Sequence, residues 1–198
     1  LCNCKIIRMI KAKYLVLRNN WIIVIFLLPI GIFAQGRLYC KEARVSFFSK
    51  TAMENIEAQN NKGLCVWDTG TGALEFSVLI KGFEFDRALM QEHFNENYME
   101  SDKYPKAVFK GKLIADKKLI VETNSNFTTE VSGTLTIHGV SRQITVPVET
   151  RLVNGVISAR ANFKVTPQDY KISIPAIVAD KINKTISIAI SVPRYSSL

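Results

Sequence analysis

Alternation of apolar and polar residues is the feature that most restricts how this chain can fold. In ALEFSVLI, the apolar side chains Leu74, Phe76, Val78 and Ile80 fall on even-numbered positions. The segment VISARANFKV alternates in the same way, with Ser, Arg, Asn and Lys between its apolar residues. An extended strand places successive side chains on opposite faces, so a period of two predicts half-buried β-strands. The chain is therefore expected to be all-β.

The strands are expected to be antiparallel, because the segments between them are short. We count about eight alternating segments, and Asn154-Gly155 is a strong signal for a two-residue hairpin. His138-Gly139 is a second expected turn, and the change of phase at Gly82 predicts a bulge or a bend. A sheet with one apolar face must close on itself or pack on another sheet. The pattern favours an extended eight-stranded antiparallel β-barrel, with a two-sheet sandwich as the alternative.

One short helix interrupts the strands. Asp86 is a candidate N-cap for residues 87–94. Leu89, Met90, His93 and Phe94 then share one face at helical spacing. Pro105 cannot join a central ladder, so it predicts the start of the next strand.

The first 34 residues predict a secretory signal peptide. They hold five basic residues and no acidic one, and residues 21–33 are an apolar run that ends before Ala34. The run is shorter than the roughly 20 residues of a membrane span, so cleavage after Ala34 is favoured over a permanent anchor. Met9 is a candidate for the true start, which would leave residues 1–8 upstream. The barrel domain is then residues 35–198, in the periplasm or secreted.

The charge and the cysteines restrict the function further. Outside the leader the chain carries 21 basic and 17 acidic residues, a net charge of +4, which is too small a surplus to indicate a nucleic-acid partner. Cys40 and Cys65 remain in the exported part, where a disulfide between them can form only if their geometry allows it. Two small semi-buried thiols are the alternative.

Catalysis finds little support in the sequence. The chain has two histidines, and neither has a cysteine or a second histidine beside it, so no metal site is expected. His138 is expected to be a solvated turn residue. An enzyme that uses His93 with Glu96 or Glu100 is an alternative hypothesis, although carboxylates in loops are more often solvated or paired with lysines. We therefore expect a protein that is not an enzyme and that has no cofactor.

Three segments resemble a known family. They are FEFDRALMQEHFNENYMESDKYPKAVFKGKL (residues 83–113), GTLTIHGVSRQITVPV (residues 133–148) and ANFKVTPQDYKISIP (residues 161–175). In this order they resemble the motifs of the YceI-like family, bacterial lipocalin-like proteins that bind polyisoprenoids. The resemblance implies a barrel whose lumen holds a long isoprenoid chain, and it implies export.

The expected function is therefore an exported protein that transports, stores or sequesters an isoprenoid or another long-chain lipid. The membrane would be a transient partner, as the source of the lipid, and the oligomeric state is open between monomer and homodimer. A stress-related interaction module with a filled core is a further alternative. The predicted ligand-binding residues are the apolar face of the strands and the helix: Phe76, Val78, Ile80, Leu89, Met90, Phe94, Phe109, Leu135, Ile137, Ile144, Val146, Phe163, Ile186 and Ile188.

Overall fold

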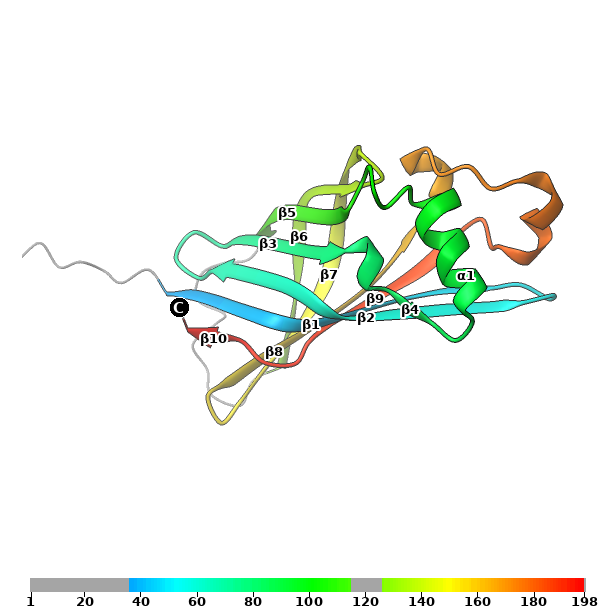
Figure 1. Cartoon of the computed structure of the whole chain (residues 1–198). Helices are drawn as coiled ribbons and strands as arrows, with labels where there is room; N and C mark the ends of the chain where they lie inside the picture. The colour runs from blue at the N-terminus through cyan, green and yellow to red at the C-terminus, as the bar shows by residue number, and fades with distance from the viewer. Residues whose placement is uncertain (1–35, 115–125, 198) are drawn as a thin grey trace, which may run out of the picture. The chain divides into compact units, whose positions relative to one another are not determined.

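Eight antiparallel strands close into a barrel in the computed structural model, which describes residues 36–114 and 126–197 (Figure 1). The predicted signal peptide lies outside the described residues. The barrel strands are β1 (Arg37–Lys50), β2 (Asn55–Asp68), β3 (Ala73–Leu79), β5 (Lys106–Ile114), β6 (Asn126–Ile137), β7 (Val140–Val153), β8 (Val156–Val165) and β9 (Ile186–Val192). Pairing of β1 with both β9 and β2 closes the ring. This confirms the predicted eight-stranded barrel, and the two-sheet sandwich is wrong.

Two further short strands pair with strands of the barrel. β4 (Glu84–Phe85) pairs with β2, and β10 (Ser196–Ser197) pairs with β1. Within the described residues, no helix is long and apolar enough to cross a bilayer.

Two-residue turns join β6, β7 and β8 as the sequence predicts. His138 and Gly139 have φ values of 50° and 72°, and Asn154 and Gly155 have 49° and 77°. Positive φ at both central residues is the conformation whose twist matches that of the flanking strands. The turns fix the register of β7 on both sides, so that Val146 and Val148 face the interior with their partners on β6 and β8.

The chain bends at Gly82, where the change of phase predicts it. β3 ends at Leu79 and a 3₁₀ turn, η1 (Ile80–Gly82), follows. Buried Asn60 supports this break, because its side-chain amide donates to the Leu79 carbonyl at 2.8 Å. A Cβ atom on Gly82 would lie 2.6 Å from the Asn60 amide nitrogen, so a larger residue there would displace the side chain that supports the break.

The helix is shorter at its start than predicted and longer at its end. α1 spans Ala88–His93 and continues into a π-helical turn, η2 (Phe94–Tyr98). The predicted Asp86 cap is wrong, because the N-cap is Arg87 and no side chain caps the helix. The Arg87 backbone is still extended, and its guanidinium instead pairs with Glu54 in the β1–β2 turn at 3.0 Å. Pro105 immediately precedes β5, as expected.

A long connection between β8 and β9 covers the same end of the barrel as α1 (Figure 1). It begins with η4 (Pro167–Tyr170) and contains η5 (Ala176–Lys181). We call residues 171–184 the strap. Its end is fixed to β1, since the Asn183 backbone donates to the Ser49 hydroxyl and the Asn183 side chain donates to the Lys50 carbonyl, both at 2.8 Å.

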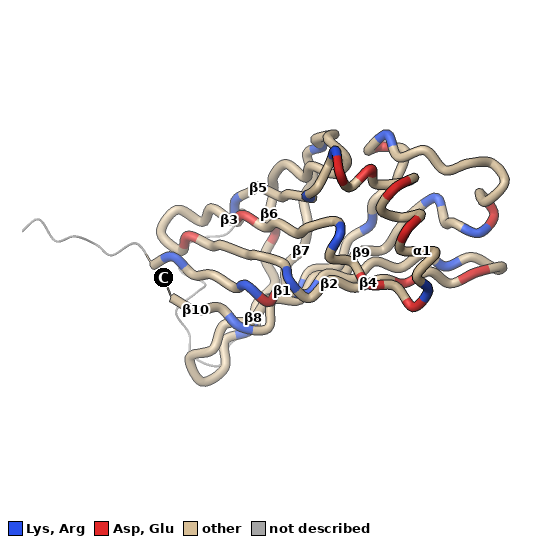
Figure 2. Tube along the Cα trace, viewed as in Figure 1, with Lys and Arg blue, Asp and Glu red and all other residues tan. Residues whose placement is uncertain are grey.

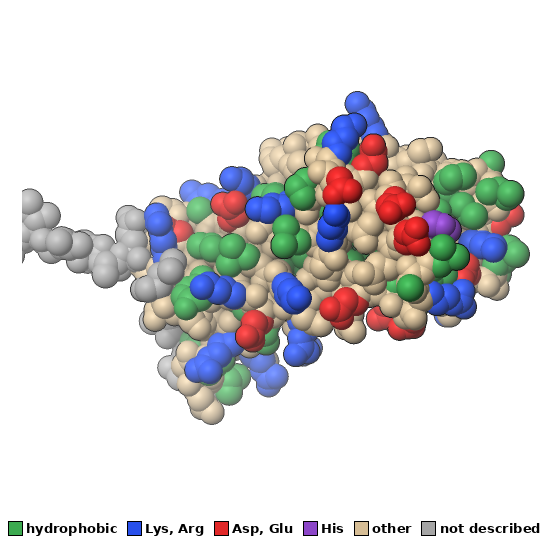
Figure 3. All heavy atoms as spheres, viewed as in Figure 1, with side chains coloured by type: hydrophobic (Ala, Val, Ile, Leu, Met, Phe, Trp, Pro, Cys, Tyr) green, Lys and Arg blue, Asp and Glu red, His purple; other side chains and the backbone are tan. Residues whose placement is uncertain are grey.

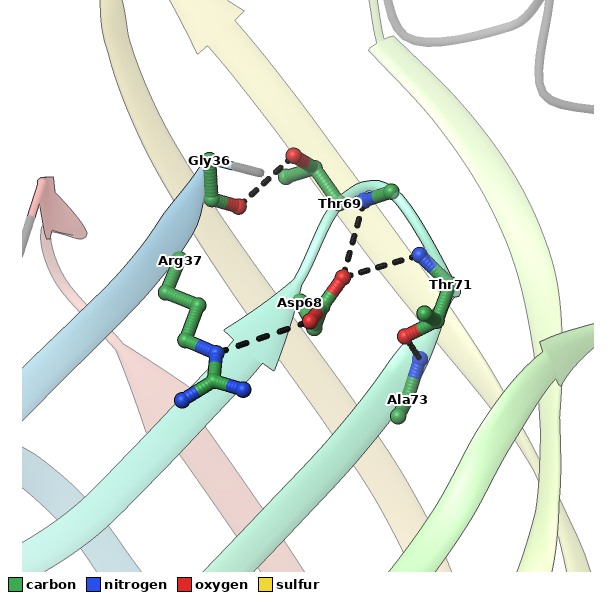
Figure 4. Close-up of polar contacts among 7 residues, drawn as sticks. Gly36, Arg37, Asp68, Thr69, Thr71 and Ala73 are labelled. Atoms are coloured by element: carbon green, nitrogen blue, oxygen red, sulfur yellow. Dashed lines mark hydrogen bonds and ion pairs between the residues drawn. The ribbon is translucent and has the colours of Figure 1, made fainter. Parts of the chain in front are cut away.

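The β2–β3 turn, at the opposite end, is organised by Asp68 (Figure 4). The Asp68 carboxylate accepts hydrogen bonds from the backbone of Gly70 at 3.0 Å and of Thr71 at 2.8 Å, and Arg37 lies 3.6 Å from it. These contacts lower the pKa of Asp68, with the Thr71 backbone bond as the largest cause. The turn therefore ties the start of β1 to the end of β2.

Candidate functional site

The barrel encloses an apolar cavity of about 520 Å³. Every one of the eight barrel strands contributes to its lining, and α1, η2 and the strap contribute at one end. The exposed lining residues on α1 and the strap are Arg87, Leu89, His93 and Lys181, which places the mouth of the cavity between these elements. A cavity of this size falls within the range that holds one ligand.

The structure places all fourteen predicted ligand-binding residues around this one cavity. β3 and η1 supply Phe76, Val78 and Ile80; α1 and η2 supply Leu89, Met90 and Phe94; β5 and β6 supply Phe109, Leu135 and Ile137; β7, β8 and β9 supply Ile144, Val146, Phe163, Ile186 and Ile188. Barrel closure turns the alternating apolar face of every strand inward, so the period of two predicted the strand residues among them. Helical spacing predicted the three on α1 and η2. Their contact with a ligand stays a prediction.

The sequence did not predict an aromatic group that packs against the helix. Phe47 packs against Phe83, Phe85 and Phe94 with ring centroids 5.5, 5.7 and 5.3 Å away, and all four rings line the cavity. Phe83 and Phe85 follow the bend at Gly82 and fall on odd-numbered positions, whereas Phe76 before the bend falls on an even-numbered one. Alternation along the chain therefore did not show that these rings lie on the same side. The group joins β1, β4 and the helix into one wall of the cavity.

The strap also lines the cavity, and the sequence analysis did not predict this. Ile172, Ile174, Val178 and Ile182 point into the lumen from a segment without regular strands. Their spacing is neither two nor a clean helical repeat, so periodicity could not identify them. Only the path of the β8–β9 connection across the mouth brings them to the site.

Cys65 and Tyr195 lie at the closed end of the cavity. Their side chains are 3.2 Å apart, both are buried, and the Trp67 ring packs edge-on against Tyr195 at 5.8 Å. Burial raises the pKa of the Cys65 thiol to about 11 and raises the pKa of Tyr195 well above its ordinary value. Both groups are therefore neutral at physiological pH.

The polar groups of the cavity are concentrated at its mouth. Arg87 and Glu54 form an ion pair at 3.0 Å, and the exposed His93 and Lys181 also border the opening. An apolar tube with a few polar groups at one end fits a ligand that has a long apolar tail and a polar head.

His138 is not the solvated turn residue that the sequence suggested. Its side chain is only 9% exposed, with Nε2 2.8 Å from the Glu100 carboxylate and Nδ1 3.2 Å from the Tyr170 carbonyl. The Tyr104 ring packs edge-on against it at 4.5 Å. The imidazole thus connects the loop after η2 to the start of the strap, which are the two segments that border the mouth.

The structure does not assemble the alternative catalytic group. Glu100 contacts His138 and Lys103, and in the described part of the chain no hydrogen bond joins His93 to Glu96 or Glu100. Nor does any group of three His, Cys, Asp or Glu side chains among these residues have the arrangement of a metal site.

Solved structures with the same fold come from several bacteria. A polyisoprenoid-binding domain from Saccharophagus degradans aligns with a TM-score of 0.71 at 14% identity, over 83% of this chain and 99% of that one. Burkholderia cenocepacia BcnA aligns with a TM-score of 0.63 at 15% identity, over 78% and 96%. A Campylobacter jejuni YceI protein aligns with a TM-score of 0.53 at 20% identity, over 71% and 84%.

The sequence comparison agrees with the fold. No curated protein sequence matches the chain at a significant level. The model of the YceI-like domain, in contrast, matches residues 38–193, which include the whole closed barrel except Arg37, the first residue of β1. This chain therefore belongs to the YceI-like domain family.

Proposed function

We propose that this protein is an exported, non-enzymatic binding protein that holds one long-chain isoprenoid, or a similar lipid, in the barrel lumen. The observation that supports it is the cavity of about 520 Å³, whose lining is mostly apolar and has most of its charged side chains at the mouth. The polyisoprenoid-binding domain of similar fold supports an isoprenoid as the ligand. The apolar run before Ala34 supports export.

The binding free energy of such a ligand comes from burial of its tail. Each CH₂ group that leaves water for an apolar site contributes about 0.8 kcal/mol. A long isoprenoid cannot stay dissolved in an aqueous compartment, so a protein that carries it must enclose most of the chain. The neutral closed end, with Cys65 and Tyr195 protonated, suits the terminal carbons of the tail. The head group would remain near Arg87, His93 and Lys181.

The two alternative functions have less support. A filled core disagrees with the open lumen between the strands. An enzyme built on His93 needs a proton acceptor beside it, and the carboxylate of Glu100 faces His138 instead.

Native mass spectrometry of protein purified from bacterial cells tests the proposal. We expect a bound lipid that organic solvent extracts, and uptake of an added isoprenoid by the stripped protein. Ala161→Phe places a ring in the lumen, because Ala161 lines the cavity. We expect this variant to lose most of the bound lipid.

Ala189→Phe is the matched control. Ala189 lies on the adjacent strand β9, opposite Asn162, and is exposed on the outer face of the barrel. It should carry as much lipid as the unaltered protein. A lipid-free protein that also fails to take up isoprenoid would refute the proposed function.

A further inference from the structure

Three exposed apolar side chains surround the mouth of the cavity. Met53 in the β1–β2 turn is 68% exposed, Leu89 on α1 is 62% exposed and Ile177 on the strap is 91% exposed. We call these three residues the mouth rim. They come from separate elements that the Arg87–Glu54 ion pair and the Asn183 hydrogen bonds hold together. Apolar side chains gather at this end of the molecule in Figure 3.

Basic side chains lie beside the mouth rim, on the strap and next to the β1–β2 turn. Lys50, Lys171, Lys181 and Lys184 are all exposed, and among the described residues none of the four forms an ion pair. Asp180 is the one acidic residue of the strap. Other acidic residues near the mouth lie outside the strap: Glu54 in the β1–β2 turn, Asp86 before α1 and Glu92 in it. Figure 2 shows acidic positions along and beside α1. The strap side of the mouth therefore carries a positive surplus.

We infer that the mouth rim docks on an anionic lipid bilayer, with Met53 and Ile177 inserted at the interface and the lysines on lipid phosphates. The inference rests on the proposed function and adds to it the surface through which the lipid enters. Long lysine side chains beside exposed apolar ones are the arrangement that binds a membrane interface. A lipid tail could then move from the bilayer to the lumen without crossing water.

A second copy of the chain fits this surface less well. In a twofold dimer the same patch faces itself, so the strap lysines of both copies, which outnumber Asp180, would repel one another. A bilayer with anionic head groups supplies the opposite charge and an apolar layer below it. Charge complementarity thus favours the membrane as the occupant.

Flotation with lipid vesicles tests the docking surface. We expect the protein to float with vesicles of phosphatidylcholine and phosphatidylglycerol, and to float less with phosphatidylcholine alone or at high salt. Ile177→Ser should weaken the binding roughly tenfold, because one inserted apolar side chain is lost. Ile114→Ser is the matched control, since Ile114 is 57% exposed at the end of β5, away from the mouth, and its loss should change nothing. Substitution of Lys181 and Lys184 by Gln should reduce the preference for phosphatidylglycerol.

Two results would overturn the inference: equal binding of Ile177→Ser and Ile114→Ser, or no flotation of the unaltered protein. A dimer in sedimentation velocity that Ile177→Ser dissociates, without vesicle binding, would assign the rim to a second copy. Native mass spectrometry of the same preparation separates the two proposals. If the protein carries lipid but does not bind vesicles, the docking inference is wrong and the proposed function stands. If the protein carries no lipid and takes up no isoprenoid, the proposed function is wrong.

Discussion

His138 Nε2 lies 2.8 Å from the Glu100 carboxylate, although the two residues are 38 positions apart in the chain. The other ring nitrogen faces the Tyr170 carbonyl at 3.2 Å. A carbonyl oxygen only accepts, so Nδ1 must carry a proton there, and an ionised carboxylate also only accepts. Each ring nitrogen of His138 therefore has an oxygen partner within hydrogen-bond distance, one on either side of the imidazole.

His138→Ala should destabilise the fold by about 2–3 kcal/mol, because it removes a charge-assisted hydrogen bond and leaves the Tyr170 carbonyl without its donor. Glu100→Gln keeps an acceptor without the charge and should cost about 1 kcal/mol. Urea unfolding followed by circular dichroism measures both. His93→Ala, at the exposed histidine, is the control and should stay within about 0.5 kcal/mol. Equal effects of the two alanine substitutions would contradict a structural role for His138.

Asp68→Asn should lower the melting temperature at neutral pH, and this effect should fade as the pH falls below 3.8. The hydrogen bonds of the β2–β3 turn hold the pKa of Asp68 below its ordinary value of 3.8, with the Thr71 backbone as the main cause. The stabilisation is present above pH 3.8 and disappears as the pH falls through the lower folded-state pKa. The difference in melting temperature between Asp68→Asn and the unaltered protein should therefore shrink as the pH falls. Asp86→Asn, at an exposed residue outside this turn, is the control. A melting-temperature difference for Asp68→Asn that stays constant with pH would refute the linkage.

The reduced protein should lose stability between pH 9 and pH 11 through Cys65. Burial raises the pKa of this thiol from 9.0 to about 11, so in this window the unfolded chain releases a proton that the folded chain keeps. The contribution is complete below pH 9 and is lost by pH 11, a change of roughly 2–3 kcal/mol. Urea unfolding in the presence of a reductant should show a steeper fall for the unaltered protein than for Cys65→Ala. Parallel pH profiles would contradict the assignment.

Cys40 and Cys65 are direct partners in the β1–β2 ladder, and both are buried. Opposed residues of an antiparallel pair have Cα atoms about 4.5–5.5 Å apart, within the range of a disulfide. The raised pKa of Cys65 keeps its thiol protonated, and only a thiolate attacks a disulfide. We expect protein refolded with oxidised glutathione to form the bond, with the loss of two hydrogen atoms from the two thiols to glutathione.

Folded, reduced protein in the same buffer should stay reduced over the same time. Mass spectrometry after alkylation distinguishes the two forms, and Cys40→Ala removes the bond while Cys65 remains. Rapid oxidation of the folded protein would show that the closed end of the barrel opens readily.

The sequence by itself determined what depends on neighbours along the chain. Alternation identified the inward faces of the strands, and the fourteen predicted residues surround one cavity because closure turns all those faces inward. Asn154-Gly155 and His138-Gly139 specified their turns through a local need for positive φ.

The tertiary structure decided everything that joins distant segments. The partners of His138 come from residues 100 and 170, the mouth combines Met53, Leu89 and Ile177, and Arg87 pairs with Glu54 where Asp86 was expected to cap the helix. Local periodicity carries no information about these contacts, since they form only when the barrel closes and the strap crosses its end.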